Sequence, residues 1–162
     1  MTIEIDPVGV IESPRREAED DFWGGEVACV VLDERFGADA LQGLDAFSHA
    51  EIIFHFDRVD PSKIVSGARH PRNNSAWPLT GIFAQRGKNR PNRLGSTICK
   101  VVRVEGRRLW VSELDAIAGT PVVDIKPVMQ EFLPRGEVRQ PDWATAVMSD
   151  YYADQATAPA AE

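Results

Sequence analysis

A loop of cationic and amide side chains is the part of the sequence best suited to binding chemistry. It reads GKNRPNRLGS, from Gly87 to Ser96, and directly follows Arg86. An arginine such as Arg90 can bind a carboxylate or a phosphate through two parallel hydrogen bonds, and Asn92 offers both donors and an acceptor. Pro91 fixes its own φ and stiffens the backbone. The pattern predicts a preorganised binding loop; the alternative is a surface turn with solvated side chains.

This loop belongs to a basic zone within an acidic chain. The 162 residues carry a net charge of −7, yet residues 66–108 hold ten of the 18 basic residues and one acid, Glu105. A chain of this overall sign is poorly suited to coating nucleic acid nonspecifically. A local basic zone instead suits one anionic ligand or one defined phosphate backbone. For Arg103, Arg107 and Arg108 a solvated strand face beside acidic neighbours is an equal alternative.

Length and composition predict one domain, over residues 1–155, followed by a frayed tail over residues 156–162. No stretch approaches the ~20 apolar residues of a membrane span, and the N-terminal sequence MTIEIDPVGVIES lacks the regions of a signal peptide. We therefore expect a cytoplasmic protein without a membrane partner. Cys29 and Cys99 lie in apolar runs and are expected to be small buried residues. No metal-ligand spacing is present, so no metal is expected.

Short apolar runs separated by turn residues predict a mainly β fold, an antiparallel barrel or sandwich with few helices. The strand candidates are DPVGVIES, EVACVVL, EIIFHFDRV, TGIFAQ, STICKVVRVEGRRLWVSEL and TPVVDIKP. The fifth reads as a hairpin that turns at Glu105-Gly106, where glycine tolerates a positive φ. GADALQGLDAFS suggests a short helical turn, and residues 59–79 form a long non-periodic connection of the kind that often binds ligands.

The last element is predicted to be a C-terminal helix. In QPDWATAVMSDYY, Pro141 suits a first turn, and Trp143, Val147 and Tyr151 recur at helical spacing. The expected fold is therefore mainly β: a small antiparallel β-barrel with a few short helices and this C-terminal helix. The sequence contains no dinucleotide-binding motif and no Walker loop.

Three motifs occur in a recognisable order: GLDAFSHAEIIFHF, GIFAQRGKNRPNRLGS and SELDAIAGTPVVDIKP. They resemble the motifs of the TrmO-like family, also called YaeB-like or TsaA-like, over roughly residues 7–132. The resemblance implies a small β-barrel methyltransferase that binds S-adenosylmethionine and works as a homodimer. Characterised members methylate N6 of threonylcarbamoyladenosine beside the anticodon of certain tRNAs. The alternatives are a methyltransferase of the same fold with a small-molecule or other RNA acceptor, and a non-catalytic S-adenosylmethionine-binding module.

The resemblance also implies roles for particular residues. Its implied cofactor-binding set is Asp21, Phe22, Trp23, Asp57, Arg58, Arg86, Ser96, Leu114, Asp115 and Ala116. The predicted substrate-binding set is Arg69, Arg72, Lys88, Arg90, Asn92, Arg93 and Lys126. The resemblance implies Arg90, Asn92 and Lys126, whereas Arg69 and Arg72 come from the long connection and Lys88 and Arg93 from the charge of the basic loop. Asp57, His49 and Asp115 are candidates for the group that removes a proton from the acceptor nitrogen.

Several of these residues have a structural alternative. Trp23 could simply pack beneath its loop, His49 could be a satisfied structural imidazole, and Asp57 could pair with Arg58. Asp124 and Lys126 share a strand face, because side chains alternate with a period of two, and could form an ion pair.

The loop also departs from the family pattern. Gly87, Asn89 and Arg93 stand where the family has serine, phenylalanine and proline, and the chain has no residues for the extra C-terminal domain of longer bacterial members.

Overall fold

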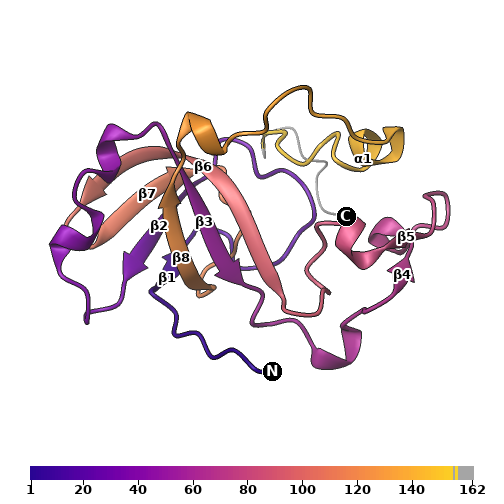
Figure 1. The fold of residues 1–162 in the computed structure, drawn as a ribbon, viewed down its shortest axis with the longest axis horizontal. Coiled ribbons are helices and arrows are strands. Elements are labelled where there is room, and N and C mark those ends of the chain that lie inside the picture. The colour runs from indigo at the N-terminus through magenta and orange to yellow at the C-terminus, as the bar shows by residue number, and fades with distance from the viewer. Residues whose placement is uncertain (155, 157–162) are drawn as a thin grey trace.

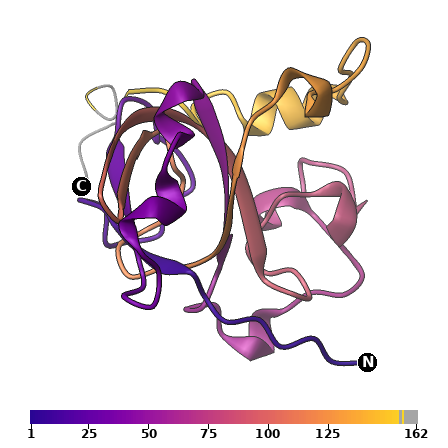
Figure 2. The ribbon, with the colours of Figure 1, turned by 60° about the vertical axis from the view of Figure 1, so that its left-hand side comes forward.

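The fold is a closed antiparallel β-barrel, as the sequence predicts, with two excursions gathered on one side of it. The computed structural model describes residues 1–154 and 156, so the predicted tail lies outside the described residues except for Ala156. The six barrel strands are β1 (Gly9–Glu12), β2 (Val27–Leu32), β3 (His49–His55), β6 (Leu94–Glu105), β7 (Arg108–Ser112) and β8 (Pro121–Pro127). They close in the order β1-β2-β7-β6-β3-β8, and Figure 2 looks into the closed ring.

Alternating side chains fill the barrel interior. In β3, Ala50, Ile52 and Phe54 are buried and the residues between them face outward, as the alternation of EIIFHF predicts. β2 carries a nearly continuous buried run and includes Cys29, while Cys99 of β6 is fully buried, so both cysteines are packed, free thiols.

The predicted hairpin forms between β6 and β7. Glu105 pairs with Arg108, so the two-residue turn is Gly106-Arg107, one residue further along than the sequence suggested. Gly106 has φ 57°, which is the left-handed conformation that glycine tolerates.

The first excursion, residues 56–93, joins β3 to β6. It contains the short antiparallel pair β4 (Ala68–Arg69) and β5 (Thr80–Gly81) and three 3₁₀ turns, at Pro61–Lys63, Pro71–Asn73 and Ile82–Ala84. The predicted strand TGIFAQ is therefore wrong beyond Gly81. There the chain turns, because the Ile82 N–H donates to the Gly67 carbonyl at 2.9 Å and the Gln85 N–H to the Ile82 carbonyl at 3.2 Å.

The second excursion is the C-terminal segment, residues 128–154, which follows β8. It contains a 3₁₀ turn at Gln130–Phe132 and the helix α1 (Asp142–Val147), which lies above the first excursion in Figure 1. The predicted helix is shorter than expected, because after Met148 the backbone pairs with an early loop of the chain (residues 20–25). GADALQGLDAFS forms two 3₁₀ turns, Ala38–Leu41 and Leu44–Ala46.

Candidate functional site

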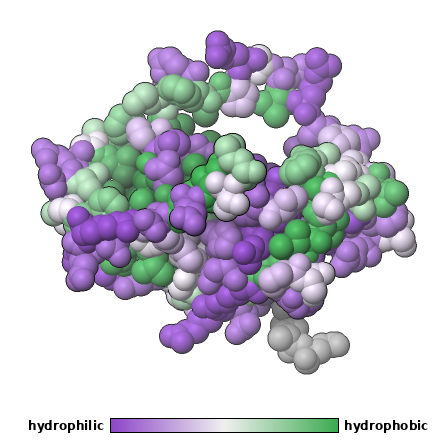
Figure 3. Space-filling view, turned by 60° about the horizontal axis from the view of Figure 1, so that its bottom comes forward, coloured by the Kyte–Doolittle hydropathy of each residue, from purple (hydrophilic) through white to green (hydrophobic). Residues whose placement is uncertain are grey.

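A cleft of about 1800 Å³ opens between one end of the barrel and the two excursions. Phe54, Gly95 and Thr97 contribute to its barrel side, the first excursion to a second wall and the C-terminal segment to a third. The space-filling view shows an opening between an upper arch of mostly hydrophilic residues and the body of the molecule (Figure 3). The size and the mixed lining suit a nucleotide-sized ligand with room for a second molecule.

The loop from Gly87 to Asn92 lies at this cleft and is tied down by backbone bonds. The Arg93 N–H donates to the Arg90 carbonyl at 3.0 Å, and the Asn89 carbonyl accepts from Val65 at 2.9 Å. The Arg90 guanidinium donates to the Gln85 carbonyl at 3.0 Å, so this side chain also braces the loop from within. The loop is therefore ordered rather than a freely solvated turn.

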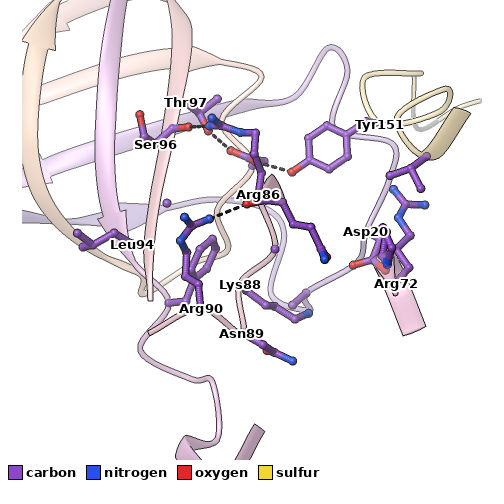
Figure 4. A pocket seen from close by; sticks show the side chains of 18 of the residues that line it. Asp20, Arg72, Arg86, Lys88, Asn89, Arg90, Leu94, Ser96, Thr97 and Tyr151 are labelled. Carbon is purple, nitrogen blue, oxygen red and sulfur yellow. Dashed lines mark hydrogen bonds between the residues drawn. The ribbon is translucent and has the colours of Figure 1, made fainter. Parts of the chain in front are cut away.

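A hydrogen-bond network runs along the start of β6, next to the loop. The Arg86 guanidinium donates to the Ser96 carbonyl, while the Thr97 hydroxyl donates to Asp115 Oδ1 and the Tyr151 hydroxyl to Asp115 Oδ2. Figure 4 shows Arg86, Ser96, Thr97 and Tyr151 near one another on one side of the cleft. Burial, and then the negative charge of Asp115, raises the pKa of Tyr151 well above its ordinary value, so the hydroxyl remains a donor.

The early loop contributes mainly by pairing and packing. Arg72 of the first excursion forms a two-bond contact with Asp21, at 2.8 and 2.6 Å, and the bond to Asp21 raises the pKa of Arg72. Trp23 is 3% exposed, with the Arg15 guanidinium 3.8 Å from its ring centroid. The packing alternative for Trp23 is thus correct, although the residue also lines the cleft. Its Nε1 is buried without a hydrogen-bond partner among the described residues, a donor that a ligand acceptor could satisfy.

Asp57 and Arg58 both line the cleft but do not pair with each other. The Arg58 guanidinium donates to the carbonyls of Ala118 at 2.8 Å and Arg16 at 3.4 Å. The Asp57 carboxylate is exposed and forms no hydrogen bond or ion pair within residues 1–154 and 156. It is therefore an uncommitted acceptor in the cleft.

The structure brings most of the predicted site residues together. The cleft lining includes Trp23, Asp57, Arg58, Arg69, Arg72, Arg86, Lys88, Arg90, Asn92, Ser96, Asp115 and Ala116. The predicted residues outside the lining are Asp21, Phe22, His49, Arg93, Leu114 and Lys126.

Three of the outlying residues have contacts that explain their positions. His49 contacts the Ser48 hydroxyl through Nδ1 at 2.8 Å, which fits the structural alternative. Lys126 Nζ lies 2.7 Å from Asp124 Oδ2, so the predicted ion pair forms on the outside of β8. Arg93 points toward the Val59 carbonyl, 3.4 Å away, and its φ of 51° is one that proline cannot adopt. The proline of the family pattern could therefore not replace Arg93 without a change of this backbone.

Sequence reasoning missed several residues of the lining. Phe83, Lys63 and Arg139 line the cleft, and so do Tyr151 and Tyr152. Phe83 is 76% exposed, which is unusual for a large aromatic side chain. Its place within the motif GIFAQR was a signal that could have been used, whereas Tyr151 was assigned only to a helix stripe.

Other kinds of site were sought in the described residues. Among residues 1–154 and 156, no three or more His, Cys, Asp and Glu side chains gather so that they could hold a metal ion. No helix in this part of the chain is long and apolar enough to cross a membrane.

The fold and the cleft define a β-barrel with an open basic site, and comparison with known proteins identifies its family. Residues 14–132 match the model of the tRNA-methyltransferase O N-terminal domain. The chain belongs to this family, which confirms the resemblance found in the motifs.

Individual relatives support the assignment. A human tRNA (adenine(37)-N6)-methyltransferase is 34% identical over 147 residues, covering 84% of this chain but only 32% of the human protein. A Pyrococcus abyssi protein named "Probable S-adenosyl-L-methionine-binding protein" is 32% identical, covering 82% of this chain and 72% of that protein. A crystal structure of TrmO from Pseudomonas aeruginosa superposes with a TM-score of 0.71 at 28% identity, over 88% of this chain and 62% of that one. This chain thus spans about a third of the human relative.

Proposed function

We propose that this chain is an S-adenosylmethionine-dependent methyltransferase that acts on N6 of an adenosine in tRNA, and specifically on threonylcarbamoyladenosine beside the anticodon. The observation that carries the proposal is the cleft, which collects residues from all three family motifs. Asp57 follows the first motif, Arg86 to Ser96 belong to the second, and Asp115 belongs to the third. The names of the human and archaeal relatives support the cofactor and the tRNA acceptor.

The residues of the cleft fit the cofactor's chemistry. Bound there, S-adenosylmethionine would supply a methyl group on a sulfonium. Arg86 offers a cation, Asp115 a hydrogen-bond acceptor and Trp23 an unpaired donor. Such groups can bind the carboxylate, hydroxyl and amino groups of this molecule. Because the transfer is an in-line displacement, alignment within the cleft can supply ~7–11 kcal/mol of barrier lowering.

Asp57 is the best-placed of the three candidate bases. Asp115 already accepts a hydrogen bond on each carboxylate oxygen, and His49 is outside the cleft lining. Asp57 alone of the three combines a place in the lining with no hydrogen bond or ion pair among the described residues. Its carboxylate would take the N6 proton as the nitrogen attacks the methyl group.

RNA is favoured over a small acceptor by the rim of the cleft. Lys63, Lys88 and Arg139 form no ion pair in the described part of the chain, so their charges remain available for phosphates. Phe83 presents an exposed ring in the same lining, and an unpaired RNA base can stack on such a ring. A small acceptor would need neither the free cations nor this ring.

The proposed active form is a two-fold homodimer in the cytoplasm. Exposed apolar side chains lie on β6 and just beyond β8, at Ile98, Val102, Met129, Phe132 and Leu133. Ile98 also lines the cleft, so a partner covering this face would lie beside the site. Sedimentation velocity at tens of micromolar should show a dimer; a monomer that still binds the cofactor would contradict this assignment.

Nucleoside mass spectrometry on tRNA from a deletion strain tests the function. We expect the N6-methylated threonylcarbamoyl nucleoside to disappear and its unmethylated precursor to accumulate, and both to revert when the gene is restored. An unchanged nucleoside profile, with cofactor binding intact by calorimetry, would favour the small-acceptor alternative. Absence of cofactor binding at millimolar concentration would overturn the methyltransferase itself.

A further inference from the structure

The C-terminal segment supplies part of the cleft although most of it lies beyond the family match. The match ends at residue 132, while Arg139, Trp143, Met148 and Tyr151 all line the cleft. The family match therefore does not include these four residues.

The end of this segment is bound to the early loop by backbone hydrogen bonds. The Phe22 N–H donates to the Asp150 carbonyl at 3.1 Å, the Trp23 N–H to the Tyr151 carbonyl at 2.8 Å and the Gly24 N–H to the Ala153 carbonyl at 3.2 Å. We call residues 148–154 the strap. A Cβ on Gly24 would lie 2.2 Å from the Tyr152 carbonyl oxygen, so this close pairing depends on glycine.

One side chain of the strap, Tyr151, forms a hydrogen bond to a carboxylate of the cleft lining. The Tyr151 hydroxyl donates to Asp115 Oδ2. Thr97, which is buried on β6, donates its hydroxyl to Asp115 Oδ1. The carboxylate is thus held from two sides, by the barrel and by the strap, as Figure 4 shows for Thr97 and Tyr151. A carboxylate fixed in this way keeps its remaining lone pairs in one direction and can accept hydrogen bonds from a ligand without reorganising.

We propose that Tyr151 is a positioning residue that orients Asp115 for the bound nucleoside and that docking of the strap is coupled to ligand binding. The strap also accepts the hydrogen bond from the Trp23 backbone N–H. Trp23 lines the cleft, and its side-chain Nε1 has no partner among the described residues. A ligand that contacts Asp115 and Trp23 binds best to the docked state, and therefore shifts the strap toward that state. This inference rests on the proposed function, because it takes the ligand to be S-adenosylmethionine or its demethylated product.

The first test compares Tyr151→Phe with Ser149→Ala in the full chain. Ser149 is an exposed residue of the strap outside the cleft lining, and its hydroxyl contacts only Asp150 Oδ2, at 3.5 Å, among the described residues. Titration calorimetry with S-adenosylhomocysteine should show affinity about tenfold weaker for Tyr151→Phe, because a bond to a charged group is lost. The Ser149→Ala variant should change by less than twofold. Equal affinities for wild type and Tyr151→Phe would overturn the proposal.

The second test uses the unmodified protein, so it does not depend on how the variants fold. Hydrogen exchange at the amides of Phe22, Trp23 and Gly24 should slow about tenfold when S-adenosylhomocysteine is added. Exchange that is unchanged at saturating ligand would overturn the coupling. If the wild-type protein binds no ligand at all, the proposed function fails; if it binds but neither test responds, only the role of Tyr151 and the strap fails.

Discussion

The barrel and the walls of the cleft are built in different ways. In the barrel, continuous antiparallel ladders surround side chains such as Val30, Ile52 and Leu109 that have no measurable exposure. The first excursion has two-residue strands and 3₁₀ turns, and three of its residues, Arg72, Asn73 and Arg93, have positive φ without being glycine.

This difference separates stability from function within one small domain. Burial in the barrel supplies most of the folding free energy, since apolar area contributes roughly 25 cal/mol per Å². The walls are held by individual hydrogen bonds and carry the charged groups, and they include backbone conformations that cost of order 1–3 kcal/mol each for non-glycine residues. Substitutions in the barrel should therefore change stability, and substitutions in the walls should change binding or catalysis.

Asp57→Asn should have the largest effect and act on catalysis alone. Loss of a general base typically costs 10²–10⁴-fold, so methyl transfer should fall by at least ~100-fold in single-turnover assays. The unfolding midpoint should be unchanged, because the Asp57 carboxylate makes no hydrogen bond or ion pair among the described residues. Asp45→Asn, an exposed acid outside the cleft, is the matched control. Full activity in Asp57→Asn would assign the proton transfer elsewhere.

Gly95→Ala tests the barrel side of the comparison. A Cβ there would lie 2.4 Å from the Phe54 ring and 2.9 Å from Phe56. Overpacking of this kind costs ~1–3 kcal/mol, so the urea midpoint should fall clearly. Gly67→Ala, where no atom lies within 4 Å of the new Cβ, is the control and should change stability little. A fully stable Gly95→Ala protein would show that the barrel end is loosely packed.

Alanine at Arg90 or Asn92 should reduce methyl transfer at least tenfold. Asn92→Ala should cost little stability, and Arg90→Ala somewhat more, because it also removes the bond to the Gln85 carbonyl. A lost hydrogen bond to a charged group costs about 1.5–3 kcal/mol, whereas ordinary surface substitutions stay within ~0.5 kcal/mol. Arg107→Ala, in the hairpin turn of the barrel, is the matched control outside the cleft lining. If both loop variants keep the wild-type kcat/KM, as the control should, the loop does not bind the reactants.

Lys88 and Arg93 should differ in their effect on RNA binding. Lys88 lines the cleft without an ion pair, whereas Arg93 lies outside the lining and points toward the Val59 carbonyl. Lys88→Ala should reduce the slope of log affinity against log salt by about one unit, and Arg93→Gly should leave it unchanged. Glycine is used because φ at Arg93 is 51°. A reduced slope for Arg93→Gly would show that Arg93 contacts the RNA.

The smallest expected effect is a pKa change at His55. Burial, and then the charge of Arg93, lowers the pKa of His55, so the unfolded state takes up a proton first and stability is lost as pH falls through the ordinary histidine range. Arg93→Gly should raise the His55 pKa and lessen that loss. An NMR titration of the His55 ring measures it directly, and no change would mean that solvent screens the two groups from each other.

The barrel was largely predictable from the sequence, but one wall of the cleft was not. The alternation in EIIFHF and the hairpin around Gly106 are local patterns, and local patterns predict strands. The strap depends on a pairing between residues 22–24 and 150–153, which no periodicity encodes. Tyr151 fitted a helix stripe equally well, so its contact with Asp115 could not be inferred from spacing.

The site residues were also predictable only in part. Arg86 and Asp115, within the motifs, and Asp57, directly after one, lie in the cleft as the family resemblance implied. His49 and Lys126 belong to the same motifs but point elsewhere, since residue type alone does not say which face of a strand a side chain occupies.

The central claim is that this chain alone binds the methyl donor and transfers its methyl group to tRNA. The most direct test incubates the purified chain with S-adenosylmethionine carrying an isotopically labelled methyl group and tRNA that contains threonylcarbamoyladenosine, followed by nucleoside mass spectrometry. The account predicts label on N6 of that nucleoside with wild-type protein, and at least ~100-fold less with Asp57→Asn. Cofactor binding without label in any tRNA nucleoside would contradict it.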